Sequence, residues 1–263
     1  MARALSPFTV WNLVKELRIA AADTRPLVIS GALAAQLEKE LARDAAPGVV
    51  RTGGRVEGAS LLVRVLGGAP TDEDAEELRA ANRAGVPVVA VQTGTEVFEV
   101  PYVLATDVVV CRPGEGFPVE EIAAAVAARL GESGTGLAAR LPLLRGPLSS
   151  VLIERFSRRN GVAAAAIFVP GADFPVLTLN QLRLVLRLAA AHGVEVDQRR
   201  LPEVLGTLGA AFGFRTLARR LLGQVPVAGW VLKSSVAYAG TRAVGEAAQR
   251  YFESIAAAAP APR

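Results

Sequence analysis

Few residues in this chain could carry nucleophilic or metal chemistry. Cys111 is the single cysteine and His192 the single histidine, which excludes an internal disulfide, a cysteine-based metal cage and a His-rich zinc site. A serine or cysteine triad would have to be built around the imidazole of His192. We therefore expect no catalytic residues, no metal and no cofactor, and the lone cysteine favours a reducing, cytoplasmic setting.

The turn where a P-loop would stand lacks the residues that bind phosphate. A P-loop reads Gly-x-x-x-x-Gly-Lys-Ser/Thr, because backbone amides surround the phosphates, the lysine contacts their outer oxygens and the hydroxyl holds Mg²⁺. Residues 31–37 instead read Gly-Ala-Leu-Ala-Ala-Gln-Leu, and residues 92–95 read Gln-Thr-Gly-Thr where an Asn-Lys-x-Asp guanine loop would follow. The sequence therefore predicts a chain without working nucleotide chemistry.

Alternating strand and helix patterns predict the elements that would position such a site. Thr71 is a good N-cap, with three acidic residues in the first turn after it. The runs at 86–91 and 107–111 are nearly continuous in apolar residues, as in parallel strands that are covered on both faces. Strands are expected at 27–31, 60–66, 86–91 and 107–111, and helices at 8–22, 33–42, 71–85 and 118–130. The first half is therefore predicted to be α/β, with a small doubly wound parallel sheet.

The glycine-rich segment 131–136 is the best candidate for a linker. After it the pattern becomes helical, with helices expected at 148–159, 162–169, 174–192, 201–222 and 226–254 and a frayed tail from 256. We therefore predict two domains, an α/β domain over 1–135 and an all-α, hydrophobic helical domain over 136–263.

Composition indicates that the second domain meets a membrane surface. Hydrophobic residues make up 51% of the chain, and the mean hydropathy of +0.35 is high for a soluble enzyme. Residues 1–139 carry a net charge of −5, whereas 16 basic and 7 acidic residues give +9 from Arg140 onward. Basic charge on apolar helices favours anionic lipid, and no nucleic-acid-reading motif accompanies it. The alternative is a solvated basic surface on an ordinary helical domain.

Two apolar arms predict a hairpin that dips into the membrane. Residues 161–169 are wholly apolar, but at about 1.5 Å per residue they span only half of a bilayer before Pro170. The next helix is apolar almost all round except for Asn180, Arg183 and Arg187. A compact soluble bundle that uses the same faces as its core is the alternative.

Several polar or small residues of this half have structural interpretations. Asp173 is expected to cap the helix that starts near Phe174 and Pro175, rather than to catalyse. Arg183 and Arg187 could pair with Asp173 or with lipid phosphate, or could extend along apolar surface to water.

His192 precedes Gly193, which is predicted to adopt the left-handed conformation that ends a helix, where a cation is favourable. Small residues at four-residue intervals in the last helix (Ala237, Thr241 and Gly245, with Gly240 and Ala248 beside them) predict a packing or self-association face. Trp230 and Tyr251 fit either the headgroup level of a membrane or a protein core.

Short motifs occur in a fixed order over about a hundred residues of the second half. They are Pro170-Gly171-Ala172-Asp173-Phe174-Pro175, then residues 180–187, then Gly209, Gly213 and Arg215, then Gly240-Thr241, Gly245 and Tyr251-Phe252. This order resembles the helical region of the YcjF-like GTPase-associated membrane proteins, a family of unknown function. The resemblance implies structural, not catalytic, roles for its motif residues: Pro170, Gly171, Asp173, Pro175, Gln181, Arg183, Arg187, Gly240, Thr241, Gly245 and Tyr251.

The first half is similar to a G domain of the kind fused to that helical region. The similarity lies in the order of the elements, in Gly-Val-Pro-Val-Val-Ala-Val at 85–91 and in Pro-Gly-Glu-Gly-Phe at 113–117. It implies a degenerate P-loop GTPase-like domain, a pseudo-GTPase. The alternative is an unrelated α/β domain that binds another ligand at its strand ends.

Together these observations predict a noncatalytic, membrane-associated accessory or scaffold protein on the cytoplasmic side of the bacterial inner membrane. The expected partners are membrane lipid, a protein such as an active GTPase, and a second copy of the chain. The alternative is a soluble small-ligand-binding protein or enzyme with a helical cap domain, whose pocket would lie near Gly31, Gly67, Gln92 and Arg112 or would bind an anion at the helix after Gly31.

Overall fold

The computed structural model describes residues 22–112, 114–166, 174–194 and 229–258, together with Asn12, Leu13, Lys15, Ile19 and Ala20. The chain divides into two compact units, Ala21–Leu148 and Ser149–Arg263 with Met1–Ala20. The first unit therefore continues beyond residue 135, the predicted domain boundary. The predicted helix over 201–222 and most of the predicted helix over 8–22 lie outside the described residues.

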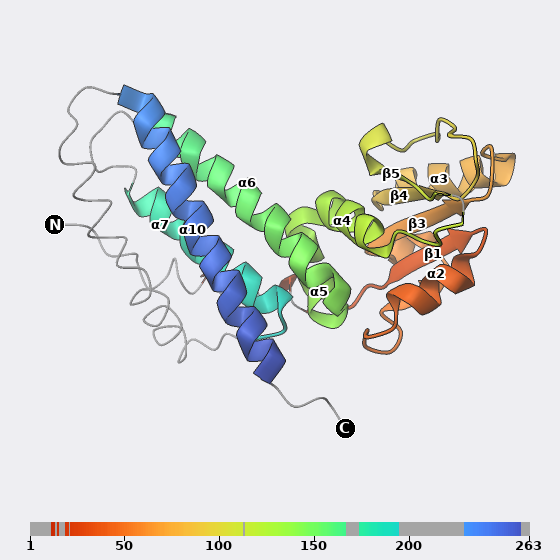
Figure 1. Cartoon of the computed structure of the whole chain (residues 1–263), viewed down its shortest axis with the longest axis horizontal. Helices are drawn as coiled ribbons and strands as arrows, with labels where there is room; N and C mark the ends of the chain where they lie inside the picture. Colours follow the sequence, from red (N-terminus) through yellow and green to blue (C-terminus); the bar gives the residue numbers. More distant parts are fainter. Residues whose placement is uncertain are drawn as a thin grey trace. The chain divides into compact units, whose positions relative to one another are not determined.

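The first unit is built on a parallel sheet, which confirms the predicted α/β class. Its five strands have the spatial order β2-β1-β3-β4-β5, and every neighbouring pair is parallel (Figure 1). The strands are β1 (Leu27–Gly31), β2 (Val50–Thr52), β3 (Leu61–Leu66), β4 (Val88–Gln92) and β5 (Val108–Val110). Four of them match predicted strands, whereas β2 is too short and too polar to have been predicted.

Three helices cover this sheet. α2 (Ala34–Leu41) packs on β1 and β2, and α4 (Val119–Leu130) packs on β4 and β5. α3 (Asp72–Ala84) buries Leu78 and Ala81 in a core cluster with Val28, Leu62 and Ala90 of three adjacent strands. All residues of β3 and β4 are buried, as expected for central parallel strands.

The residues around the predicted linker form a packed part of the first unit. Residues Gly131–Gly134 form a 3₁₀ turn, and α5 (Thr135–Arg140) and a second turn at Pro142–Leu144 follow. A Cβ at Gly134 would lie 3.0 Å from the Leu130 Cβ, so the glycine allows the chain to fold back closely against α4. Residues 131–136, predicted as a linker, therefore form a turn and the start of a helix within the first unit.

The described part of the second unit consists of three helices. They are α6 (Arg145–Ala166), which starts in the first unit, α7 (Phe174–Ala191) and α10 (Gly229–Ala258). The predicted break near residue 160 is absent, and α6 continues through Gly161. A Cβ at Gly161 would lie 3.4 Å from the Ser234 carbonyl oxygen, so the glycine lets α10 pack closely against α6. None of the helices described is both long and apolar enough to span a bilayer.

Two glycines of α10 make a test of helix packing. A Cβ at Gly245 would lie 2.7 Å from Ile153 Cγ1 and 3.0 Å from Leu184 Cδ2, whereas a Cβ at Gly240 would meet nothing within 4 Å. We expect Gly245→Ala to destabilise the protein by about 1–3 kcal/mol through overpacking. Gly240→Ala should stabilise it by about 0.5–1 kcal/mol, because alanine is the better helix former. Urea unfolding followed by circular dichroism measures both, and equal effects of the two variants would contradict this packing.

Candidate functional site

The strand order places a candidate site at the carboxyl ends of β1 and β3. The chain leaves β1 toward β2 on one side, while β3 lies on the other side of β1. In doubly wound sheets, ligands bind in the crevice outside the carboxyl ends of strands at such a reversal. The turn that follows β1 and the Gly67-Gly68 turn that follows β3 meet here, since a Cβ at Gly67 would lie 3.5 Å from the Ala32 Cβ.

The turn after β1 is bonded to β3. Gly31 has a φ of 93°, and a Cβ there would overlap the Val65 carbonyl oxygen, at 2.1 Å. The Ala32 amide donates to that same oxygen, at 3.0 Å. Leu33 adopts the left-handed conformation, with a φ of 55°, and caps α2 without a side-chain hydrogen bond. At least one amide that a phosphate loop would direct at a ligand is therefore used inside the sheet.

Arg64 of β3 lies beside this turn and is almost fully buried, at 7% exposure. Its Nε would be 3.3 Å from a Cβ at Gly31. Nε donates to Asp74 Oδ1 at 2.7 Å, Nη2 lies 2.5 Å from the same oxygen, and Nη1 pairs with Glu77 Oε2. Ser30 Oγ of β1 donates to Glu77 Oε2 at 2.9 Å. The network of Ser30, Arg64, Asp74 and Glu77 therefore joins β1, β3 and α3.

Asp74 has a second role as part of the α3 cap. The Thr71 amide donates to Asp74 Oδ2 at 2.7 Å, and the Asp74 amide donates to Thr71 Oγ1 at 3.3 Å, which completes a capping box. Burial raises the pKa of Asp74, but the hydrogen bonds from Thr71 and Arg64 outweigh burial and hold that pKa below its ordinary value. The carboxylate is therefore ionised at neutral pH.

The charge balance of this network is unfavourable for phosphate. One guanidinium faces two carboxylates, and Asp72 and Glu73 add negative charge in the first turn of α3. A phosphate site requires net positive charge or unused amides. The arrangement therefore argues against the anion-binding alternative at this turn.

The loop after β4 is also bonded to its own strand. Gln92 is buried, its Nε2 donates to the Phe98 carbonyl oxygen at 2.6 Å, and its Oε1 accepts from the Phe98 amide at 3.0 Å. The Thr93 amide donates to the Leu66 carbonyl oxygen at 2.9 Å. At the position of a guanine-reading loop, the side chain therefore holds the backbone instead of facing a ligand.

Arg112, the last predicted pocket residue, lies at the open edge of the sheet. Its side chain is 79% exposed and is 3.7 Å from Glu115. It lines a groove of about 620 Å³ between β5 and α4, together with Val108, Val110, Glu121 and Ala125 among others. Of the four predicted pocket residues, Gly31 and Gly67 lie in adjoining turns, Gln92 is buried and Arg112 lines this separate groove.

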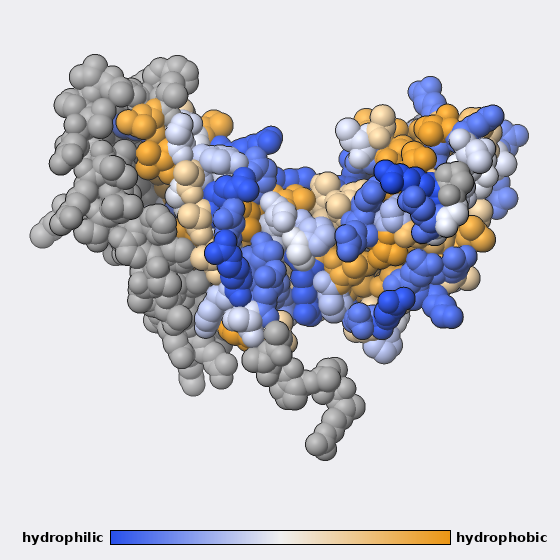
Figure 2. Space-filling view, in the orientation of Figure 1, coloured by the Kyte–Doolittle hydropathy of each residue, from blue (hydrophilic) through white to orange (hydrophobic). Residues whose placement is uncertain are grey.

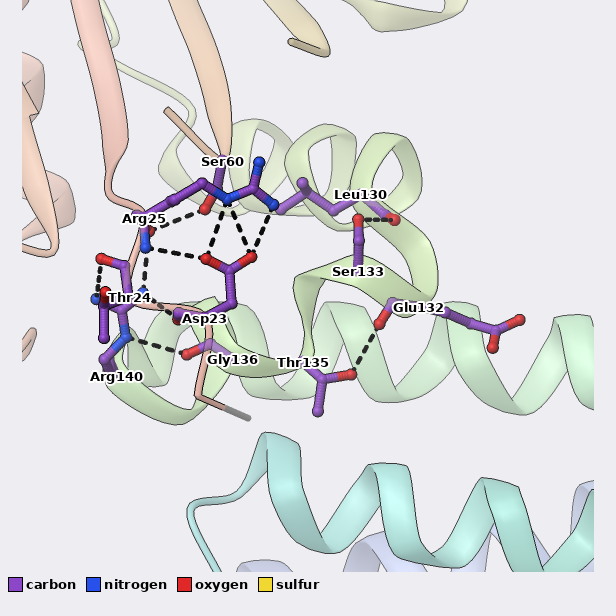
Figure 3. Close-up of polar contacts among 10 residues, drawn as sticks. All are labelled: Asp23, Thr24, Arg25, Ser60, Leu130, Glu132, Ser133, Thr135, Gly136 and Arg140. Atoms are coloured by element: carbon purple, nitrogen blue, oxygen red, sulfur yellow. Dashed lines mark hydrogen bonds and ion pairs between the residues drawn. The ribbon is translucent and has the colours of Figure 1, made fainter. Parts of the chain in front are cut away.

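A polar cluster at the amino end of β1 is structural. Figure 3 shows Arg140 of α5 beside the segment that leads into β1, and Arg25 paired with Asp23. Arg140 donates to the carbonyl oxygens of Asp23, Thr24 and Arg25 at 2.9–3.2 Å, and Ser60 Oγ donates to the Arg25 carbonyl oxygen at 2.8 Å. The acceptors of Arg140 are backbone groups of the same unit, so this cation fixes the chain entering the sheet.

The second unit contains a buried network of uncharged polar groups. Asn160 of α6 and Thr241 of α10 are fully buried, and Asn160 Nδ2 donates to Thr241 Oγ1 at 2.8 Å. Two residues of α7 join them: Asn180 Nδ2 donates to Asn160 Oδ1 at 2.9 Å, and Gln181 Nε2 donates to Thr241 Oγ1 at 3.3 Å. Two motif residues, Gln181 and Thr241, therefore bind helices to one another.

The other motif residues are distributed along the three helices. Pro175 is the second residue of α7, where proline is tolerated, and Tyr251 contacts Phe252 edge-on at 5.4 Å between ring centroids. Arg183 is half-buried and Arg187 is buried at 7% exposure. Pro170, Gly171 and Asp173 lie outside the described residues, so the capping role predicted for Asp173 stays a prediction.

His192 lies at the end of α7, inside the second unit. Gly193 has a φ of 74°, which confirms the predicted left-handed helix end. The His192 ring is buried beside Phe252, and its Nε2 is 3.3 Å from Ser149 Oγ. A serine beside an imidazole could serve as a nucleophile and base, but Ser149 and His192 are only 0% and 5% exposed, so a substrate cannot reach the hydroxyl in this conformation.

Within the parts of the chain that the structure describes, no group of three His, Cys, Asp or Glu side chains is arranged to hold a metal ion. Comparison of the chain with protein-family models, with curated proteins and with solved structures finds no match.

The Arg64 network predicts a strong effect of losing its cation. Arg64→Met should destabilise the protein by about 3 kcal/mol, because the buried Asp74 and the half-buried Glu77 would then lack their cation. Arg51→Met, at an exposed position of β2, should change stability by less than about 0.5 kcal/mol. Chemical unfolding of both variants measures this, and equal losses would contradict a specific role for Arg64.

The lowered pKa of Asp74 predicts the pH dependence of the same network. A carboxylate with a depressed folded-state pKa contributes stability above its unfolded pKa, near 3.8, and loses that contribution as pH falls through the folded value. The stability difference between wild type and Asp74→Asn should therefore be constant above about pH 5 and should shrink below pH 4. Unfolding titrations from pH 7 to pH 3 measure it, and a difference that grows on acidification would contradict the assignment.

Proposed function

We propose that this protein is a noncatalytic, membrane-associated accessory protein. In this proposal the α/β unit is a pseudo-GTPase that serves as a docking surface for another protein, and the helical unit attaches to the cytoplasmic face of an anionic membrane. The observation that carries the proposal is the Arg64 network, because it fills the place where a G domain would bind phosphate with the chain's own charges.

The α/β unit supports the noncatalytic part. The turn after β1 gives an amide to Val65, the loop after β4 is held by Gln92, and the side chains beside the turn carry net negative charge. These features are the reverse of what nucleotide binding needs, namely free amides and a cation at the same turn.

The directions of the helices support the membrane part. Gly161 of α6 lies beside Ser234 of α10, and Asn160 donates to the carbonyl oxygen of Leu177 in α7. Ser149, His192 and Phe252 meet at the opposite end. The end of α6 and the starts of α7 and α10 therefore lie at one end of the unit, which we call the apolar tip.

Three large apolar side chains are exposed at the apolar tip. They are Val162 of α6, Val176 of α7 and Leu232 of α10, at 69%, 43% and 39% exposure. Figure 2 shows apolar residues at this end, where α10 begins. Exposed apolar side chains from three helices at one end of the unit support an interaction surface there.

Basic residues lie within about one turn of the apolar tip. Arg158 precedes Val162 by four positions in α6, and Lys233 follows Leu232 in α10. Arg158 is 75% exposed, and its ion pair with Glu154 is a surface pair that contributes little stability. Lipid phosphate could replace the Glu154 carboxylate with little loss of free energy, while the apolar side chains of the tip enter the headgroup region.

Vesicle binding of the full chain tests the membrane part. Vesicles with phosphatidylserine should co-sediment the protein more than purely zwitterionic vesicles, and added salt should weaken the binding. The double variant Val162→Asp with Val176→Asp should reduce binding by at least tenfold. Val97→Asp is the control, since Val97 is 67% exposed in the α/β unit, and it should bind as wild type does.

Two results would overturn the membrane part: no binding to anionic vesicles, or equal loss of vesicle binding in the tip variant and the control.

The noncatalytic part is tested by thermal unfolding with GTP or GDP and Mg²⁺. We expect no change in Tm, and a concentration-dependent rise would contradict it.

A further inference from the structure

We propose that the open edge of the sheet at β5, together with the adjoining side of α4, is an interface between two copies of this chain. In the interface β5 pairs antiparallel with β5 of the second copy about a two-fold axis. The inference is independent of membrane attachment, since all of its residues lie in the α/β unit.

The two edges of the sheet differ in how they are protected against pairing. At β2, Arg51 and Thr52 are exposed, and a charged residue on an edge strand discourages pairing with another chain. β5 itself consists of three valines, Val110 is 39% exposed, and the exposed Arg112 follows the strand by two residues and lies 3.7 Å from Glu115. An uncharged, β-branched edge of this kind favours the addition of a strand.

The groove of about 620 Å³ beside β5 provides room for a partner. The other wall of the groove is α4, which contributes Ala124, Ala125 and Ala128 and, one turn before them, Glu121. Residues at these spacings share one side of a helix. Because the wall is made of alanines, a second helix that accompanies an added strand can approach α4 closely.

Charge at the two ends of α4 favours a second copy as the occupant. Glu120 and Glu121 lie in the first turn of α4 and Arg129 in the last turn. A two-fold axis near Val109 runs the two β5 strands antiparallel, and therefore also the two α4 helices. The acidic turn of each copy then lies near Arg129 of the other, whose side chain is 40% exposed and lies 3.5 Å from Asp107 of its own chain, and the helix dipoles oppose. An extended peptide from another protein could add a strand but would not bring this charge pattern.

Sedimentation velocity of the full chain, over a range of concentrations in detergent-free buffer, tests the interface. We expect a wild-type dimer, and Val110→Lys should raise its Kd by at least tenfold by placing a charge on the pairing edge. Val97→Lys, in the loop between β4 and β5, should leave the Kd unchanged. A wild-type chain that stays monomeric at every concentration would overturn the proposal.

Crosslinking keeps the test decisive if Val110→Lys does not fold or if another surface also associates. Ala125→Cys should form a covalent dimer on mild oxidation, because Ala125 lies near the two-fold axis. Wild type should not, since Cys111 is buried and burial raises the pKa of its thiol. A dimer that yields no Ala125→Cys crosslink would overturn the proposal. A dimer whose Kd does not change in Val110→Lys would also overturn it, because such a dimer would form through another surface, such as the helical unit.

Discussion

The α/β unit depends on the ion pairs that the buried Arg64 makes with Asp74 and Glu77. A guanidinium between β3 and α3 is tolerated only because both carboxylates neutralise it and their hydrogen bonds compensate for lost hydration. The same carboxylates reach Ser30 of β1 and the cap at Thr71, so strand, helix and turn share the contact. The carboxyl edge of the sheet, where ligands enter related architectures, is here an internal joint.

The helices of the second unit are joined by buried polar contacts that carry no charge. Asn160, Asn180, Gln181 and Thr241 satisfy one another through amides and a hydroxyl, which are cheaper to bury than ions. These hydrogen bonds, together with the close contact at Gly245, fix the position of α10 against α6 and α7. These neutral contacts therefore hold the three helices together without burying an ion.

Much of the fold was accessible from sequence where local and tertiary signals agree. β3, β4 and α3 were predicted because apolar runs and the Thr71 cap are local features. β2 was missed because two of its three residues are exposed. The packing at Gly134 was missed because its neighbour Leu148 lies on a later helix, and local spacing does not encode that contact. Arg64 gave a usable signal, a charge within a buried apolar run followed by acids at 74 and 77. The hydrogen-bond partners of Arg64 and of Thr241 lie on other helices or strands. The spacing of residues along the sequence does not predict which of these elements meet.

The position of Arg64 next to Gly31 would make phosphate binding hard to introduce at this turn. Installing Gly-Lys-Ser in the turn after β1, by evolution or by design, would place the new lysine beside two carboxylates that compete with phosphate for it. Removing Arg64 first would strand two acids, and removing the acids first would strand Arg64. We therefore expect either order of removal to pass through a destabilised variant. Substitutions on the outer surfaces of the unit avoid this loss of stability.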